Sequence, residues 1–130
     1  MLGAVILFYT FLLAIAVRLS SRPLACAVAW IAARLIAIVP FVIAGMITGG
    51  EAGWAFLMYF WHLDLPILLP VIEAITKHSD RLFTAPLSHY LDNLICAFGY
   101  LAWYGGGGYA VARWLRSRKS LTSQARQSIG

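Results

Sequence analysis

Four long apolar runs dominate this 130-residue chain and leave little of it for anything other than helices in a lipid bilayer. They cover residues 2–17, 24–48, 53–72 and 93–115, and none alternates apolar with polar residues as the strands of a membrane barrel do. A helix that crosses a bilayer needs about 20 mostly apolar residues. The chain is 62% hydrophobic and 12% charged, against about 25% charged in soluble domains. The sequence therefore predicts an all-α integral membrane protein.

The third run departs from a simple transmembrane span. Its stretch WHLDLPILLP contains His62, Asp64, Pro66 and Pro70. An aspartate at the bilayer centre costs about 2.5 to 3.5 kcal/mol, and each proline removes a backbone donor from a helix. We therefore predict three transmembrane helices plus one interfacial or re-entrant, proline-kinked helix over 53–72. The alternative is a four-helix transmembrane bundle.

Charge is divided unevenly along the chain, and this division predicts the orientation. Residues 51–92 contain all five acids and only two basic residues, whereas the rest of the chain contains eight basic residues and no acid. Basic residues concentrate on the cytoplasmic side of membrane helices. We expect a multi-pass protein of the inner membrane with its N-terminus outside and its C-terminus cytoplasmic. The first run is predicted to stay uncleaved, because no Lys or Arg precedes its apolar stretch.

The last part of the chain is predicted to be a tail outside the membrane. Residues 1–115 form the single membrane domain, and 116–130 form a basic cytoplasmic tail with a mobile end. Asp92 or Asn93 is expected to cap the last membrane helix. The tail can hold anionic lipid at about 1 kcal/mol per basic residue near the surface. Nucleic acid is not expected as a partner, because so short a tail has neither aromatic residues nor a fold of its own.

Small residues at helical spacing and aromatic residues near the third run are the candidate interaction sites. Small-xxx-small faces allow two helices to approach closely in lipid, and aromatic residues gather at headgroup level. Packing within the protein's own bundle and docking of another subunit are both open. The candidate interaction residues are Ala25, Ala29, Ala33, Arg34, Gly45, Gly49, Trp54, Trp61, Gly105 and Gly108.

Arg34 is the one basic residue well inside a predicted span. A charge at that depth marks a candidate functional site. Its side chain is expected to reach the cytoplasmic headgroups or to pair with Asp64, if the third run dips that far. The remaining alternative is that Arg34 lines a path for an ion or a substrate.

Histidine and acidic residues lie close together in the segment 51–92 and are the candidate metal ligands. Imidazole nitrogen and carboxylate oxygen suit zinc and similar ions, but no HExxH motif or nearby cysteine accompanies them. We therefore predict no metal and no cofactor, with a metal- or haem-dependent subunit as an alternative. The candidates, should the segment converge, are His62, Asp64, His78, Asp80, His89 and Asp92.

The motifs of common enzymes are missing from this sequence. It has no nucleophile elbow, no phosphate loop and no dinucleotide fingerprint, so an enzyme is not expected. The predicted function is that of a small bacterial-type inner-membrane protein acting by protein–protein contacts, as an accessory subunit or an immunity or exclusion factor. Its expected partners are the lipid bilayer and another integral membrane protein or a second copy. The alternative is a holin-like homo-oligomer that forms a pore or transports a solute.

Overall fold

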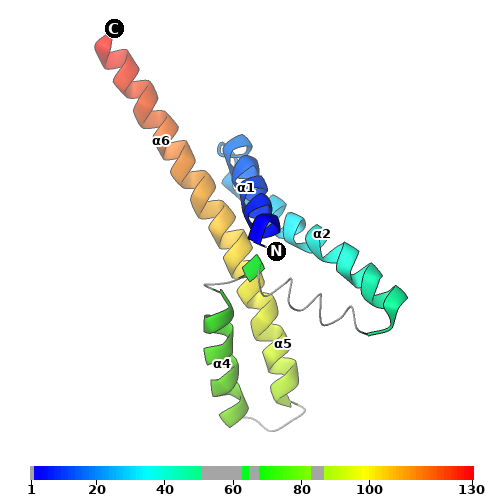
Figure 1. Ribbon diagram of the computed structural model, residues 1–130. Helices are drawn as coiled ribbons and strands as arrows, with labels where there is room; N and C mark the ends of the chain where they lie inside the picture. Colours follow the sequence, from blue (N-terminus) through cyan, green and yellow to red (C-terminus); the bar gives the residue numbers. More distant parts are fainter. Residues whose placement is uncertain (1, 51–62, 65–67, 83–86) are drawn as a thin grey trace.

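The computed structural model describes residues 2–50, 63–64, 68–82 and 87–130, and all regular structure in these residues is helical. This confirms the all-α prediction. The elements are shown in Figure 1 and are α1 (Leu2–Arg18), α2 (Pro23–Thr48), α4 (Leu68–Leu82), α5 (Leu87–Tyr100), the π-helix η1 (Leu101–Gly106) and α6 (Gly107–Ile129).

The first two helices form a hairpin joined by a short turn. The Arg22 N–H donates to the Leu19 carbonyl oxygen at 2.9 Å, which closes the turn. Pro23 is the first residue of α2. Its ring fixes φ near the helical value, and its missing N–H is no loss in the first turn of a helix. Both helices coincide with the first two apolar runs.

A glycine ends α2. Gly49 has φ 66°, in the left-handed region, and its N–H donates to the Gly45 carbonyl oxygen at 3.2 Å. Glycine reaches this conformation without the steric cost of a Cβ atom, which is why it commonly terminates helices. Gly49 was a candidate for helix packing, but in the structure it is the residue at which the helix stops.

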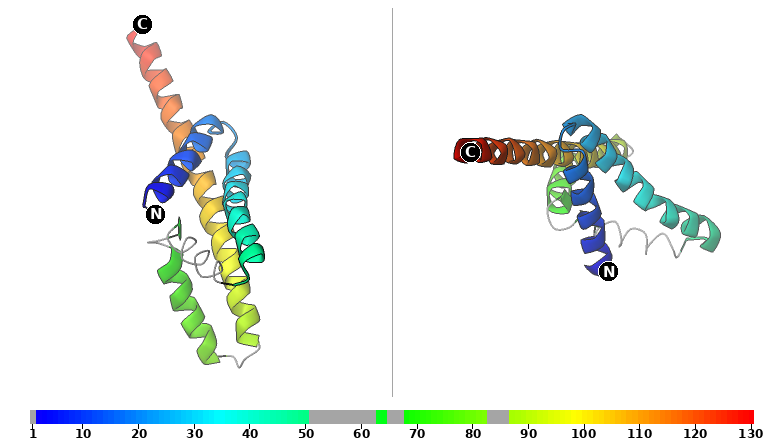
Figure 2. Two further views of the ribbon diagram at one scale, coloured as in Figure 1. Left: turned by 45° about the vertical axis from the view of Figure 1, so that its right-hand side comes forward. Right: turned by 90° about the horizontal axis from the view of Figure 1, so that it is seen from above.

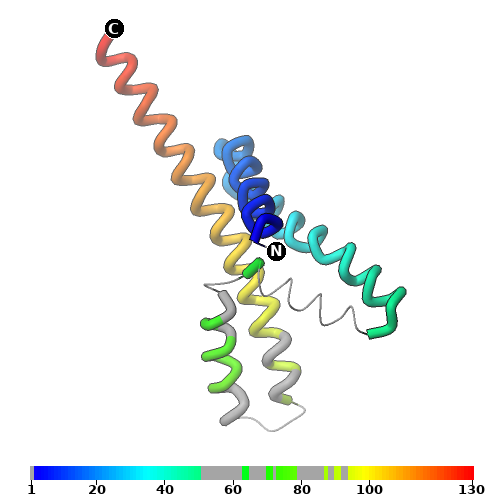
Figure 3. Tube along the Cα trace, viewed as in Figure 1, coloured from blue at the N-terminus to red at the C-terminus, as the bar shows by residue number. Residues whose placement is uncertain are grey.

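A continuous helix runs from Leu87 to Ile129 through α5, η1 and α6, about 60 Å at about 1.5 Å per residue (Figure 3). It begins before Asp92, so the prediction that Asp92 or Asn93 caps it was wrong. It also continues through the tail after residue 115, which we expected to be mobile at its end. That tail is rich in Arg, Lys, Leu, Gln and Ala and has no proline, so local propensity favours a helix.

Helix α4 begins within the third apolar run and extends beyond the predicted end of that run at residue 72. It packs beside α5, and the two form an antiparallel pair at one end of the molecule (Figures 1 and 2). The α1–α2 turn lies toward the other end, where α6 leaves the bundle (Figure 2). Leu63 and Asp64 lie between these two ends. The residues 53–62 and 65–67 of the predicted kinked helix lie outside the described residues.

The core is small, and much of the apolar surface faces outward. One cluster of buried side chains links α1, α2, η1 and α6, and its members are Leu12, Ala16, Cys26, Trp30, Tyr104 and Ala112. Among the described residues, α2 is the one helix long and apolar enough to cross a membrane, and only 17% of its most apolar window is buried. The core helix of a soluble protein would be mostly buried. Helix α1 is apolar but shorter.

Candidate functional site: a buried arginine–aspartate pair

Arg34 and Asp64 form an ion pair at the centre of the structure. Arg34 Nη2 donates to Asp64 Oδ2 at 2.7 Å, and each residue is 3% exposed. Arg34 lies about midway along α2, and Asp64 comes from the short helical segment of residues 63–64. The pairing of Arg34 with Asp64, one of the two structural alternatives drawn from the sequence, is confirmed. A charge in apolar surroundings is stable only when it is paired in this way.

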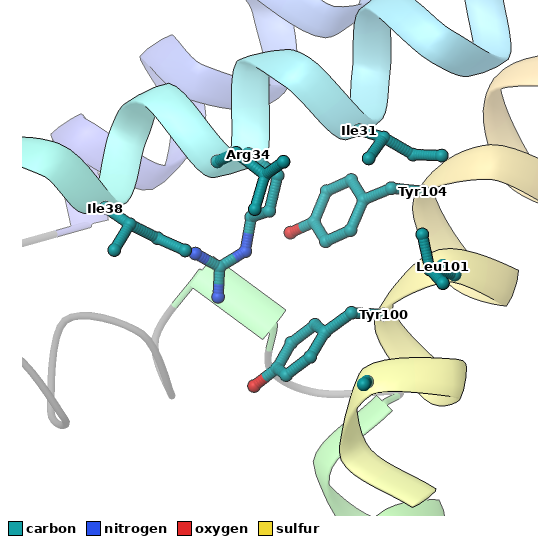
Figure 4. Close-up of a pocket in the computed structure, with 8 residues that line it drawn as sticks. Ile31, Arg34, Ile38, Tyr100, Leu101 and Tyr104 are labelled. Atoms are coloured by element: carbon teal, nitrogen blue, oxygen red, sulfur yellow. The ribbon is translucent and has the colours of Figure 1, made fainter. Parts of the chain in front are cut away.

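Two tyrosines complete the surroundings of the pair. The Tyr104 hydroxyl donates to the other carboxylate oxygen, Asp64 Oδ1, at 2.5 Å. The Arg34 guanidinium lies 5.1 Å from the centre of the Tyr100 ring and 5.7 Å from that of Tyr104 (Figure 4). Contacts of a cation with ring faces are attractive within about 6 Å. Both oxygens of Asp64 therefore accept hydrogen bonds, and the charge of Arg34 is balanced by a carboxylate and two aromatic rings.

The segment that carries Asp64 is also held by α1. The Tyr9 hydroxyl donates to the Leu63 carbonyl oxygen at 2.7 Å, and Leu63 itself is fully buried. Residues 63–64 are thus bound by α1 through Tyr9, by α2 through Arg34 and by η1 through Tyr104. Three parts of the chain that are far apart in sequence meet at these two residues.

The π-helix and the glycines after it bring the long helix close to α2. A π-helix is wider than an α-helix and occurs mostly as a single turn within an α-helix, frequently at a functional site. The ring of Trp30 lies against Gly108, where an added Cβ would come within 3.0 Å of the ring and 3.2 Å of the Ala27 Cα. At Gly105 an added Cβ would come within 3.1 Å of Ile31. The glycine run therefore provides the close approach that carries Tyr104 to Asp64.

Trp30 ties this contact to α1 as well. Its indole Nε1 donates to the Leu12 carbonyl oxygen at 2.9 Å, although that carbonyl belongs to another helix. Leu12 and Ala16 of α1 are fully buried against the same cluster. The Trp30 side chain thus packs on α6 with its ring and donates a hydrogen bond to α1 from its Nε1.

A cavity of about 330 Å³ lies between α2 and the α5–η1 helix, next to the ion pair (Figure 4). Its wall contains aliphatic side chains, the rings of the two tyrosines and the stem of Arg34. The lining residues are Ile31, Arg34, Leu35, Ile38, Ala97, Tyr100, Leu101 and Tyr104. Arg34 and Tyr104 each donate one hydrogen bond to the Asp64 carboxylate, so this group joins α2 and η1 beside the cavity.

The candidate metal ligands do not gather into a site among the described side chains. No group of three or more His, Cys, Asp or Glu residues converges there. Asp64 is engaged by Arg34, and His78 is exposed on α4. The side chains of His62, Asp80, His89 and Asp92 lie outside what the structure describes.

The candidate interaction residues are distributed over different environments. Ala33 packs on the buried cluster, whereas Ala25 is exposed and Ala29 is half-buried. A Cβ added at Gly45 would meet no atom within 4 Å. Gly105 and Gly108 pack against α2 of the same chain. Trp54 and Trp61 lie outside the described residues.

Reasoning from sequence missed the aromatic members of the site. Tyr9, Tyr100 and Tyr104 carry hydroxyl groups within apolar runs, and a buried tyrosine hydroxyl usually needs a hydrogen-bond partner. The four-residue spacing of Tyr100 and Tyr104 places them on one helical face, which is the signal that indicates a shared contact.

Comparison with known protein families, with curated proteins and with solved structures finds no match. The class of this protein therefore follows from its own fold and site. It is a helical protein whose described residues contain one candidate membrane-spanning helix, exposed apolar faces and a central buried ion pair.

Proposed function

We propose that this chain is a multi-pass inner-membrane protein that acts as an accessory subunit, through contacts with the helices of another integral membrane protein. The observation that carries the proposal is the outward exposure of large apolar side chains along α1 and α2. Such surfaces are unfavourable in water and are expected where lipid or another apolar helix covers them. They include Leu2, Ile6, Leu7, Phe11, Leu13, Leu24, Val28, Ile36, Ile43, Met46 and Ile47.

The order of the elements in space supports three crossings with a re-entrant segment. Helices α1 and α2 run in opposite directions, and the long helix from α5 to α6 spans the whole length of the molecule (Figure 1). Between α2 and α4 the chain comes back to the level of Arg34, since Asp64 is paired there. Helix α4 then leads away again to the end where α5 begins. A span that returns to the side it came from leaves the two termini on opposite sides of a bilayer.

The ion pair supports a structural role within the membrane over a pore. Arg34 is buried and neutralised by Asp64. Its charge therefore binds the re-entrant segment and does not line a water-filled path. A holin-like oligomer would need a polar stripe along one span. Arg34 is also the only charged residue within 24–48.

One face of α2 is the best-placed contact surface for a partner helix. Ala25, Ala29, Ile36 and Ile43 follow each other at intervals of four and seven residues, which places them on one side of the helix. We call this the outward face of α2; Arg34 points to the opposite side. Ile36 and Ile43 are 68% and 51% exposed. Small residues near one end permit close approach of a second backbone, and the isoleucines supply packing area.

Site-specific photo-crosslinking in intact membranes tests the proposal. A photoreactive amino acid replaces Ile43 on the outward face of α2, and the matched control replaces Leu13 of α1, which is 53% exposed. We expect one defined adduct from position 43, with a mass that identifies a different membrane protein, and none from position 13.

Other results would count against it. An adduct of twice the chain mass from position 43 would replace the proposal with a homo-oligomer. Lipid adducts alone at both positions, or recovery of the chain in the soluble fraction after cell lysis, would refute it.

A further inference from the structure

The end of the bundle where α1 turns into α2 carries strong positive charge, and the described helices that form it, α1, α2 and α6, contain no acid. Residues 1–50 and 93–130 contain no aspartate or glutamate. The basic residues at the α1–α2 turn and on α6 are Arg18, Arg22, Arg113, Arg116, Arg118, Lys119 and Arg126. Counter-charge for this end must therefore come from outside these two parts of the chain, and anions will concentrate there.

A pocket of about 490 Å³ lies at this end, between the start of α2 and one face of α6. It is a hollow that is open to the surface and not an enclosed cavity. On α6 the lining residues recur every three or four positions, so they share one side of the helix. The residues that line it are Pro23, Tyr109, Arg113, Arg116, Ser117 and Ser120.

The two arginines are the charged donors of this pocket. The hydroxyls of Ser117 and Ser120 donate to carbonyl oxygens one turn earlier on α6, at 2.8 and 2.7 Å. These two side chains therefore line the pocket without offering it a free hydroxyl hydrogen. Arg113 and Arg116 are exposed. Their guanidinium forks match the oxygens of a phosphate group, which they can bind with two parallel hydrogen bonds each.

The start of α2 adds a second, fixed source of positive potential. No side chain caps this end of the helix, and Pro23 at the pocket wall is its first residue. Pro23 has no N–H, and the Cys26 N–H donates to the Arg22 carbonyl oxygen at 3.1 Å. The N–H groups of Leu24 and Ala25 are left at this helix end, where such groups attract anions. The turn is held against α6, because Lys119 Nζ donates to the hydroxyl of buried Ser20 at 3.0 Å. The two halves of the pocket are thus fastened to each other.

We propose that this pocket is a binding site for the phosphate group of an anionic phospholipid. Arg113 and Arg116 hold the phosphate oxygens, and Pro23 at the start of α2 forms the opposite wall. The pocket lies where α6 leaves the bundle: Gly108 and Ala112 are buried, and every residue from Arg116 onward is exposed. In a membrane protein this is headgroup level, where the ring of Tyr109 fits and lipid phosphates are the abundant anions. The inference rests on the membrane location proposed above.

Lipid binding to the purified full-length chain in detergent tests this site, with native mass spectrometry as the readout. Phosphatidylglycerol is titrated against phosphatidylcholine and against inorganic phosphate. The site variant is R113Q/R116Q, and the control R118Q/R126Q removes the same charge from the other side of α6. We expect the site variant to bind phosphatidylglycerol at least about tenfold more weakly, the loss of one or two charge-assisted contacts. The control should remain within about twofold of the unaltered protein, as expected when no such contact is lost.

Each other outcome overturns a stated part of the proposal. Equal losses in both variants would mean diffuse attraction to the basic helix and no site. Binding of inorganic phosphate as tight as that of phosphatidylglycerol would exclude a lipid as the source of the phosphate. The variant R113K/R116K, which keeps the charge but not the fork, should bind with intermediate affinity. Unchanged helical content by circular dichroism excludes misfolding as the cause. Because the assay needs no partner protein, its failure is separate from failure of the crosslinking experiment.

Discussion

Replacing the two members of the buried ion pair one at a time and together measures what the pair contributes to stability. Asp64→Leu leaves the Arg34 charge without its carboxylate, and Arg34→Met leaves the Asp64 charge with the hydroxyls of Tyr104 and Tyr100 as neighbouring donors. Removing one partner of a buried pair costs about 3 to 5 kcal/mol, because an uncompensated charge stays in apolar surroundings. We expect each single variant to lose about that much of the free energy of unfolding.

The double variant is the informative one. An apolar pair of similar volume is often as stable as the ion pair it replaces. What remains is the Tyr104 hydroxyl without its acceptor, which costs about 1 to 3 kcal/mol. We therefore expect the double variant Asp64→Leu/Arg34→Met to be at least about as stable as either single variant. Its loss of unfolding free energy should be much smaller than the sum of the two single losses.

The measurement is unfolding in mixed micelles at rising SDS fraction, followed by circular dichroism and tryptophan fluorescence. Tyr104→Phe serves as a control, since it keeps the ring but removes the hydroxyl, and should cost about 1.5 to 3 kcal/mol. The loss of unfolding free energy in the double variant could equal the sum of the two single losses within about 0.5 kcal/mol. Such additivity would show that the two charges do not interact. That result would refute the reasoning.

Three further predictions concern packing and topology. Gly108→Ala should destabilise the fold by about 1 to 3 kcal/mol, since its Cβ would press on Trp30 and the backbone of α2. Gly106→Ala, with nothing within 4 Å, should be neutral or stabilise by up to about 1 kcal/mol. The same SDS titration checks both variants, and equal effects would contradict the close contact at Gly108. Trp30→Phe should cost at least about 1 kcal/mol, because it removes the hydrogen bond to the buried Leu12 carbonyl and part of the ring packed against Gly107 and Gly108; an unchanged midpoint would argue against both contacts. A reporter fused ahead of Met1 should be active outside the cytoplasm and one after Gly130 inside it; two reporters on the same side would favour four crossings.

Much of the helical layout could be predicted from the apolar runs. The first two runs coincide with α1 and α2, because an unbroken apolar stretch of that length has few alternatives to a helix. Boundaries in the polar part were harder to predict. The helix begins at Leu87, before the predicted cap, and the tail after Trp114 is helical where a mobile end was expected. Both extensions depend on local propensity and on being continuous with a helix that is already formed.

The sequence indicated the two charged residues of the central site and, as one alternative, their pairing, but not the aromatic residues around them. Arg34 is conspicuous because a lone charge inside an apolar run must be neutralised, and Asp64 is conspicuous for the same reason. Nothing in the spacing of the two residues, 30 positions apart, requires that they meet. The aromatic residues gave a weaker signal still, since tyrosines are common in membrane helices.

The amino-acid sequence by itself determined that the chain is helical, that long apolar runs make up most of it, and that most of its positive charge lies away from its acids. These properties follow from composition and order, which hold in any conformation. Only the tertiary structure decided that Asp64 reaches Arg34, that Tyr104 and Tyr9 hold the same segment, and that the glycine run admits Trp30. Such contacts depend on how closely helices approach one another, and that distance is set by the side chains of several segments acting together.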